Sequence, residues 1–338
     1  MLLEFPSHPS SLAGATYCPP WWLPGGHIQT IYAALAAPRP RVAYRRERWD
    51  TPDGDFIDLD WVEERGTGDD GRSRAPRVVL FHGLEGSSRS PYALALMAAV
   101  RDAGWHGVVV HFRGCAGELN RLPRAYHSGD STEIDWILRR LRARHPDAPL
   151  FAAGVSLGGN ALLKWLGETG ASACSVIGRA AAVSAPVDLM AAGAVLDRGF
   201  NLLYTRHFLV TMKRKALAKL EQYPGLFDAA RVRAAGTLRD FDDAFTAPLH
   251  GFRNTDDYWT RASSKPGLGK IRVPTLVINA RNDPFLPARD LPATAEVSDT
   301  VALEQPEEGG HAGFVSGRFP GHLGWLPARV LEFFGRVP

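Results

Sequence analysis

Short apolar segments alternate with helix-like stretches from residue 77 to the end of the chain, and this alternation restricts the fold more than any other feature. We expect the apolar segments to be strands, at 77–81, 107–111, 150–153, 180–184, 273–279 and 299–303. We expect helices at 92–103, 131–144, 160–166 and 327–334. Short apolar strands that alternate with helices form a parallel sheet covered on both faces. The sequence therefore predicts an α/β fold with a mostly parallel, twisted sheet flanked by helices.

The region before this alternation has a different character. Residues 1–40 are rich in Pro and Trp, which excludes one long helix and indicates an ordered N-terminal extension. We expect the adjacent Trp21 and Trp22 to fill the core, with a place on the wall of an acyl pocket as the alternative. Residues 41–49 and 55–62 alternate in hydrophobicity and predict two antiparallel strands.

The alternation is interrupted once, between residues 188 and 270. This stretch contains helix-like segments at 208–223 and 227–238 and no convincing strand. Ligands of open α/β sheets bind at the carboxyl edge of the strands, so we expect 188–270 to be a helical cap inserted over that edge. With this insertion, the 338 residues fit a single domain that spans 1–338.

The composition is that of an ordinary globular protein. Hydrophobic residues make up 45% of the chain and charged residues 22%, values that disfavour disorder. The 39 Lys and Arg residues barely exceed the 36 Asp and Glu residues, and a net charge of +3 gives no reason to expect nucleic acid as a partner.

The cysteines and the N-terminus bear on cellular location. Cys18, Cys115 and Cys174 show no C-x-x-C spacing, so we expect neither a disulfide framework nor a metal site, and no cofactor. Residues 1–20 lack the continuous apolar core of a signal peptide. No apolar run reaches the ~18–20 residues of a membrane span. These features predict a cytoplasmic protein without an integral membrane segment, and they leave peripheral membrane contact open.

One serine lies in the sequence context of a catalytic nucleophile. Residues 154–159 read Gly-Val-Ser-Leu-Gly-Gly, a G-x-S-x-G pattern between the apolar run 150–153 and the helix-like stretch 160–166. A sharp turn from strand to helix lifts the serine oxygen above the sheet, and the helix N-terminus favours a developing anion. The pattern also occurs by chance as an ordinary Gly/Ser turn, but this context predicts that Ser156 is a nucleophile.

A serine nucleophile needs a histidine base and an acid that orients the histidine. In α/β hydrolases the acid and then the histidine follow the serine along the chain. Asp283 follows the strand expected at 273–279, and His311 follows the strand expected at 299–303. Singly, Asp283 could belong to a turn and His311 to a loop. Their order and placement together predict a triad with Ser156.

Other residues are weaker candidates for these two roles. Asp188, after the strand expected at 180–184, is the alternative acid. Four further histidines are weaker candidates for the base because none follows the final strand, namely His82, His111, His127 and His250.

An oxyanion hole requires two backbone N–H groups. One is expected from Leu157, directly after the nucleophile, and the other from the loop 82–86 after the first apolar strand. We assign the second donor to Leu84, with Gly83 as the weaker alternative.

Several motifs spread over most of the chain resemble those of the YheT-type α/β hydrolases, a group that includes eukaryotic abhydrolase-domain lipases and yeast ethanol acyltransferases. The matching stretches are residues 27–30, 82–86, 90–92, 111–115, 126–129, 156–160, 241–243, 250–252, 283–285 and 309–311. The resemblance implies a cytoplasmic carboxylesterase-like hydrolase with Ser156, Asp283 and His311 as its triad. An H-x-x-x-x-D element accompanies acyl transfer in some relatives, but Thr132 stands at that spacing from His127.

These observations predict a serine hydrolase that cleaves short- to medium-chain carboxylic esters through an acyl-enzyme. The expected partner is a small ester or lipid substrate. The alternatives are an alcohol O-acyltransferase that uses the same acyl-enzyme and a non-catalytic lipid-binding protein. Arg113 is expected to hold a turn, with substrate contact as the alternative, and Cys115 is expected to pack in the interior.

Overall fold

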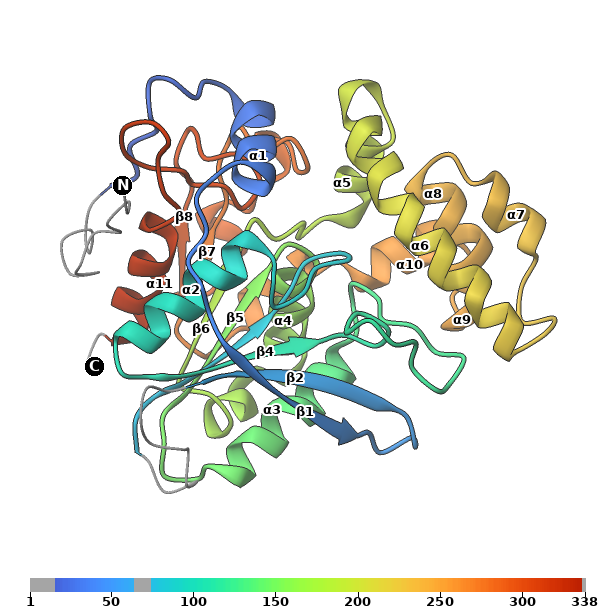
Figure 1. Ribbon diagram of the computed structural model, residues 1–338, viewed down its shortest axis with the longest axis horizontal. Coiled ribbons are helices and arrows are strands. Elements are labelled where there is room, and N and C mark those ends of the chain that lie inside the picture. Colours follow the sequence, from blue (N-terminus) through green and yellow to red (C-terminus); the bar gives the residue numbers. More distant parts are fainter. Residues whose placement is uncertain (1–15, 64–73, 336–338) are drawn as a thin grey trace.

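The computed structural model describes residues 16–63 and 74–335, and its centre is an eight-stranded sheet (Figure 1). The strand order is β1-β2-β4-β3-β5-β6-β7-β8, in which β1, β2 and β4 pair antiparallel and the later neighbours pair parallel. The strands are β1 (Tyr44–Asp50), β2 (Phe56–Val62), β3 (Arg77–Phe81), β4 (His106–His111), β5 (Leu150–Val155), β6 (Arg179–Val183), β7 (Thr275–Ile278) and β8 (Val301–Glu304). The expected strands are thus present, with bounds shifted by a few residues.

Helices cover both faces of this sheet. They are α2 (Pro91–Asp102) and α11 (Trp325–Gly335) on one face, and α3 (Ser131–Arg144) and α4 (Leu157–Thr169) on the other. In β3, Val79 and Phe81 share an apolar cluster with α3 and α4, whereas Val78 and Leu80 share one with α2 and α11. Burial on both faces explains why these strands are continuously apolar rather than alternating.

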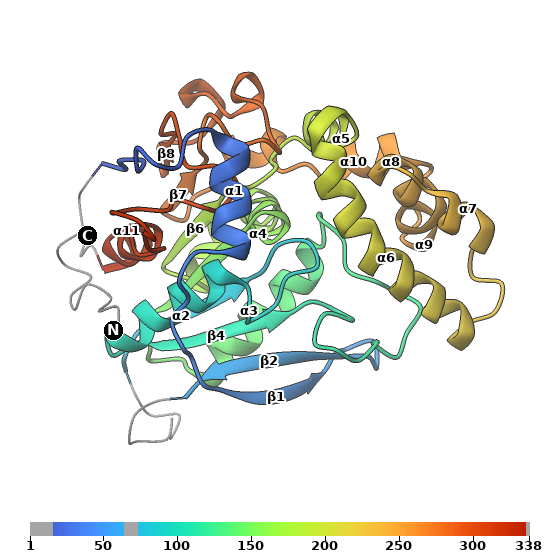
Figure 2. The same cartoon turned by 45° about the horizontal axis from the view of Figure 1, so that its top comes forward.

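A second group of helices lies beyond the carboxyl edge of the sheet (Figures 1 and 2). It comprises α5 (Leu189–Leu196), α6 (Leu202–Gln222), α7 (Ala229–Ala234), α8 (Leu238–Phe241), α9 (Ala247–Leu249) and α10 (Thr255–Ala262). These helices share an apolar cluster of their own, to which Phe285 from the sheet edge also belongs. No helix within residues 16–63 and 74–335 is both long and apolar enough to cross a membrane.

The bounds of two expected helices in this region are wrong. Helix α6 begins at Leu202, before the expected 208, because its first turns pack on the neighbouring helices. The helix expected at 227–238 is broken. Helix α7 ends at Ala234, and Thr237 begins α8 with a capping box, in which its side chain accepts from the Asp240 amide and the Asp240 side chain accepts in return.

The described part of the N-terminal extension contains α1 (Gly26–Leu35), which packs against the segment after β8. The turn before α1 is closed by a hydrogen bond from Leu23 N to Pro20 O, and it buries Leu23 rather than the tryptophans. Trp21 is 90% exposed, so the expectation that it fills the core is wrong. Trp22 is partly buried, and its ring packs edge-on against Tyr32 at 5.1 Å.

Candidate active site

Ser156 lies in a strained turn between β5 and α4. Its backbone has φ 54° and ψ −122°, a conformation that non-glycine residues rarely adopt and that is common at functional sites. Two glycines permit this turn because the backbone segments approach closely. A Cβ on Gly154 would lie 2.5 Å from Gly158 O, and a Cβ on Gly158 would lie 2.3 Å from Phe81 O. Ser156 is therefore presented at the N-terminus of α4.

Asp283 and His311 form a hydrogen-bonded pair at the ends of β7 and β8. His311 Nδ1 lies 2.9 Å from Asp283 Oδ2 and 3.2 Å from Oδ1, and the Asp283 side chain is buried. An ionised carboxylate only accepts, so Nδ1 carries the proton and Nε2 is free to accept one. The Asp283 carboxylate also accepts from Phe285 N at 2.8 Å, and the Phe285 ring stacks on the imidazole at 4.0 Å.

The loop that carries His311 is held by side chains from distant parts of the sequence. The amides of residues 309–312 donate in succession to side-chain oxygens at 2.8–3.0 Å, and these acceptors are Gln29 Oε1, Asn282 Oδ1, Thr30 Oγ1 and Ser184 Oγ. Two of the four acceptors lie on α1. No local pattern in the sequence predicts this role, although residues 27–30 are among the family-like motifs.

Ser156 and His311 line the same cavity, but they are not hydrogen-bonded to each other in the described structure. Such bonds are often long without substrate and shorten in the reactive complex. Asp188, the alternative acid, accepts instead from Ala191 N at 3.0 Å and begins α5.

The other candidate histidines are engaged elsewhere. His111 Nε2 lies 2.9 Å from Asp60, and both ring nitrogens of His250 lie 2.8 Å from backbone carbonyl oxygens. Burial lowers the pKa of His82 to about 3 and that of His127 to about 4. Neither buried ring accepts a proton readily near neutral pH.

Two backbone N–H groups beside Ser156 could bind an oxyanion. Within the described residues, neither Leu84 N nor Leu157 N donates a hydrogen bond to a protein acceptor. Gly83 N, the weaker candidate, donates to Tyr92 Oη at 2.9 Å and is already used. The loop is close to the nucleophile, because a Cβ on Gly83 would lie 3.1 Å from Ser156 Cβ.

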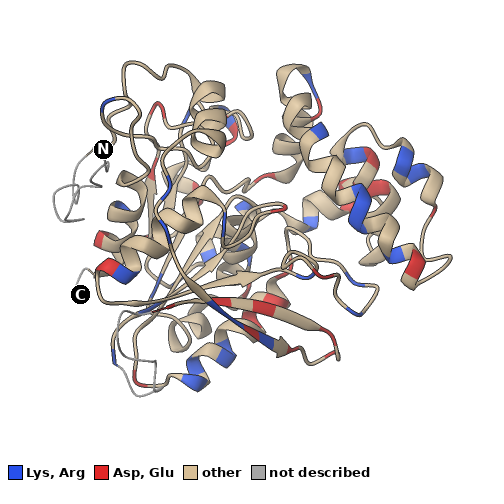
Figure 3. Ribbon diagram, in the orientation of Figure 1, with Lys and Arg blue, Asp and Glu red and all other residues tan. Residues whose placement is uncertain are grey.

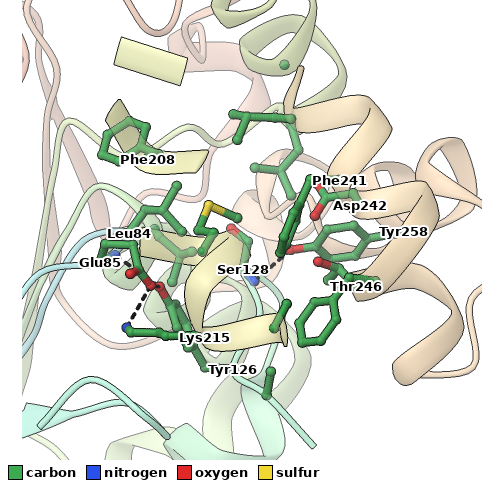
Figure 4. A pocket seen from close by; sticks show the side chains of 18 of the residues that line it. Leu84, Glu85, Tyr126, Ser128, Phe208, Lys215, Phe241, Asp242, Thr246 and Tyr258 are labelled. Atoms are coloured by element: carbon green, nitrogen blue, oxygen red, sulfur yellow. Dashed lines mark hydrogen bonds and ion pairs between the residues drawn. The ribbon is translucent and has the colours of Figure 1, made fainter. Parts of the chain in front are cut away.

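The cavity lies between the sheet edge and the second group of helices (Figure 4). Its wall is mostly apolar, with Leu84 and Phe285 from the sheet side, and Phe208, Phe241 and Trp259 from α6, α8 and α10. Neither Trp21 nor Trp22 lines it, so the acyl-pocket alternative for the two tryptophans is also wrong. A cavity of this composition can hold an acyl chain next to Ser156.

Polar groups on the cavity wall are paired with one another. Lys215 of α6 reaches Glu85 at 2.9 Å, and Tyr126 Oη donates to the same carboxylate at 2.8 Å (Figure 4). Burial raises the pKa of the nearby Cys115 to about 11, so this thiol is a poor nucleophile and packs in the interior, as expected. Burial also raises the pKa of Asp242 to about 7.

Arg113 holds a turn, as the sequence suggested. Its buried guanidinium pairs with Asp53 at 2.9 Å, Asp55 at 3.0 Å and Glu133 at 2.6 Å. It also lines the cavity, so its position permits the alternative of substrate contact as well.

Comparison with known proteins agrees with the fold. Residues 76–317 match the family described as alpha/beta hydrolase fold. The chain is 38% identical over 309 residues to YheT of Escherichia coli (strain K12), whose name gives it provisionally as an esterase, with 91% of this chain and 89% of that protein covered. It is 33% identical over 308 residues to phospholipase ABHD3 of Homo sapiens, with 90% and 75% covered.

A more distant relative and a solved structure extend the comparison. The chain is 28% identical over 286 residues to medium-chain fatty acid ethyl ester synthase/esterase 2 of Saccharomyces cerevisiae, with 77% of this chain and 62% of that protein covered. The structure of the Pyrococcus furiosus esterase Pf2001 is similar with a TM-score of 0.53 at 15% identity, over 88% of this chain and 96% of that one. At this identity the structural likeness concerns the fold alone.

Proposed function

Because the chain belongs to the α/β-hydrolase fold family, we propose that it cleaves carboxylic esters with Ser156 as nucleophile, His311 as base and Asp283 as the acid that orients the base. The observation that carries the proposal is the buried Asp283–His311 hydrogen bond beside a serine on a strained turn, with serine and histidine on one cavity wall. The expected family and fold are confirmed, and relatives named as an esterase and a phospholipase agree with an ester hydrolase.

The first half of the reaction forms an acyl-enzyme. His311 Nε2 accepts the proton of Ser156 Oγ as the oxygen attacks the ester carbonyl carbon. The carbonyl oxygen becomes an oxyanion, which accepts hydrogen bonds from the N–H groups of Leu84 and Leu157. Asp283 stays ionised and stabilises the imidazolium. His311 then gives its proton to the departing alkoxide oxygen, and the alcohol leaves.

The second half releases the acid by the same steps with water. His311 Nε2 accepts a proton from water as the water oxygen attacks the acyl carbon, and the same two N–H groups bind the second oxyanion. The intermediate collapses, and Ser156 Oγ leaves with the proton from His311. In each step the transferred proton moves only between Ser156, His311, the water and the alcohol. Ser156 and His311 therefore return to their starting states at the end of the cycle.

The apolar wall supports short- to medium-chain acyl groups as substrates. In this proposal, 1–338 is one domain, 188–270 is the cap that shapes the acyl pocket, and 1–40 is an extension whose helix α1 steadies the His311 loop. The cytoplasmic location and the lack of a nucleic-acid partner remain predictions from the sequence.

Hydrolysis of p-nitrophenyl esters from acetate to palmitate tests the proposal. We expect the wild type to cleave some members and the Ser156→Ala variant to lose ~10³-fold or more of that rate. The two proteins should melt alike, because Ser156 Oγ makes no hydrogen bond to the described residues. If the variant retained most of the rate, Ser156 would not be the nucleophile. If the wild type cleaved no member of the series, the ester-hydrolase proposal would fail.

Acyl transfer to an alcohol is the second candidate, because the yeast relative is named as both an ester synthase and an esterase. Both reactions share the acyl-enzyme and differ only in whether water or an alcohol attacks it. Adding ethanol to the hydrolysis assay separates them. Ethyl ester formed at the expense of free acid, in proportion to ethanol, indicates transfer, whereas free acid alone indicates hydrolysis.

A further inference from the structure

The exposed large hydrophobic side chains in the described part of the chain are confined to two regions. They are Trp21, Ile28, Leu35 and Phe319 in and around α1, and Phe200, Leu203 and Val210 in and before the first half of α6. Phe319 belongs with α1 because its ring lies 5.4 Å from Trp22, which in turn packs against Tyr32 of α1. Scattered single exposed hydrophobics need no explanation, but such grouping marks an interaction surface.

The two regions join into one surface, which we name the apolar rim and define by these seven residues. The ring of His27 on α1 lies 4.6 Å from the Phe200 ring and stacks on Tyr204 of α6 at 5.9 Å. His27 Nδ1 also lies 3.2 Å from Tyr204 Oη. Figure 2 shows α1 and the start of α6 on the same side of the molecule.

The apolar rim lies beside the candidate active site. The Tyr204 ring lies 4.9 Å from Phe285, whose ring stacks on His311 at 4.0 Å. On the α1 side, Thr30 Oγ1 accepts from His311 N at 2.8 Å. A surface bound to the rim would therefore lie next to the residues that we propose to be catalytic.

The chain segments that carry the rim bear charge of one sign. The segments 16–46, 198–220 and 309–331, which carry the rim, contain no Asp or Glu. Exposed arginines stand beside the hydrophobic residues, at 39, 198, 206, 214 and 318. Figure 3 shows the basic residues along α6. Two neighbouring carboxylates are turned toward other groups, since Asp197 accepts from the amides that begin α8 and Glu308 accepts from Gln29.

We propose that the apolar rim docks the protein on an anionic lipid surface. Apolar side chains on such a surface enter the boundary between head groups and acyl chains, while the arginines attract anionic head groups. A second copy of the chain fits this surface less well, because a symmetric contact would bring the rim arginines of the two copies together. Delivery of a lipid ester to Ser156 would follow if the proposed function holds, but docking itself does not depend on it.

Vesicle co-sedimentation tests the docking independently of the chemistry, with every protein in a Ser156→Ala background. The vesicles are phosphatidylcholine alone and phosphatidylcholine with phosphatidylglycerol. One variant removes rim hydrophobics that do not line the cavity (Leu35→Ser, Leu203→Ser and Val210→Ser). A second removes rim charge (Arg206→Gln and Arg214→Gln). A control removes the same charge from ion pairs elsewhere (Arg139→Gln and Arg253→Gln).

We expect tight binding to the anionic vesicles and weak binding to phosphatidylcholine. The charge variant should lose about tenfold or more of its binding, given about 1 kcal/mol per basic residue at an anionic surface. The apolar variant should lose a comparable amount, and the control should bind as the parent does. Thermal melts show whether each variant is folded. If the apolar variant is unfolded, the charge variant alone tests the docking.

Three results would overturn the proposal. The first is a parent protein that does not sediment with anionic vesicles. The second is equal binding by the parent and both rim variants. The third is a parent protein that sediments as a dimer in sedimentation velocity and an apolar variant that sediments as a monomer, with no binding of either to vesicles. The rim would then be an interface between copies of the chain.

Discussion

At the scale of single residues, the proposed mechanism requires that His311 carries its proton on Nδ1 and not on Nε2. In the proposed mechanism, the Asp283 carboxylate 2.9 Å from Nδ1 holds the proton on that nitrogen and leaves Nε2 to act as the base. We predict that Asp283→Asn lowers kcat about 10³–10⁴-fold with little change in melting temperature, because the amide no longer enforces this tautomer or stabilises the imidazolium. The ester assay and a thermal melt check it. Activity within tenfold of the wild type would remove Asp283 from the proposed triad.

Asp242 provides a prediction about pH at the same scale. Burial raises the pKa of its carboxyl to about 7 from an ordinary value of about 4. The folded state thus holds this proton more tightly than the unfolded chain, so its contribution makes stability fall as pH rises from about 4 to about 7. Asp242→Asn, which keeps an acceptor for Trp259 Nε1, should remove that fall.

Denaturant titrations of the wild type and Asp242→Asn across this pH range measure the effect. We expect the two proteins to be equally stable at about pH 4. Above about pH 7, the free energy of unfolding of the variant should be higher by at most about 4 kcal/mol. Parallel stability profiles for the two proteins would show that the Asp242 carboxyl is not perturbed in this way.

At the scale of elements, α1 is a support for the active site rather than an appendage. Thr30 Oγ1 accepts from His311 N and donates to Gly26 O. We predict that Thr30→Val lowers kcat about tenfold with KM nearly unchanged, since the His311 loop loses an acceptor without any change in the acyl pocket. Thr30→Ser keeps the hydroxyl and should restore kcat. Because Val keeps the methyl group of Thr and loses only the hydroxyl, full kcat in Thr30→Val would show that the hydrogen bond from His311 N is not needed.

The same elements show what a sequence pattern can predict. The strands and the strained turn at Ser156 are predictable because apolar runs and glycine spacing are local features of the chain. The sequence predicts one helix at 227–238, whereas the structure has a helix that ends at Ala234 and another that begins at Leu238. The helical pattern continues through this stretch, and the capping box at Thr237 interrupts it. The support from Thr30 to His311 joins residues 281 positions apart, and no local pattern reveals such a contact. Trp21 was misplaced because a high content of tryptophan does not show which side chains a turn buries.

At the scale of the whole molecule, an ion pair joins the proposed cap to the sheet beside the cavity. Lys215 of α6 meets Glu85 in the loop after β3 at 2.9 Å. We predict that Lys215→Met destabilises the fold by about 1–2 kcal/mol, because the largely buried Glu85 carboxylate loses its cationic partner. Lys213→Met on the same helix removes an exposed hydrogen bond to Arg233 O and serves as the matched control. Equal unfolding free energies for the two variants would contradict this role.

The central claim is that Ser156 is a nucleophile activated by His311, and covalent labelling tests it most directly. The 338-residue chain is treated with a fluorophosphonate, and the modified peptide is identified by mass spectrometry. We predict one adduct, on Ser156, which is absent in Ser156→Ala and forms at least ~10²-fold more slowly in His311→Ala. An adduct on another residue, or none while the wild type still hydrolyses esters, would contradict the account.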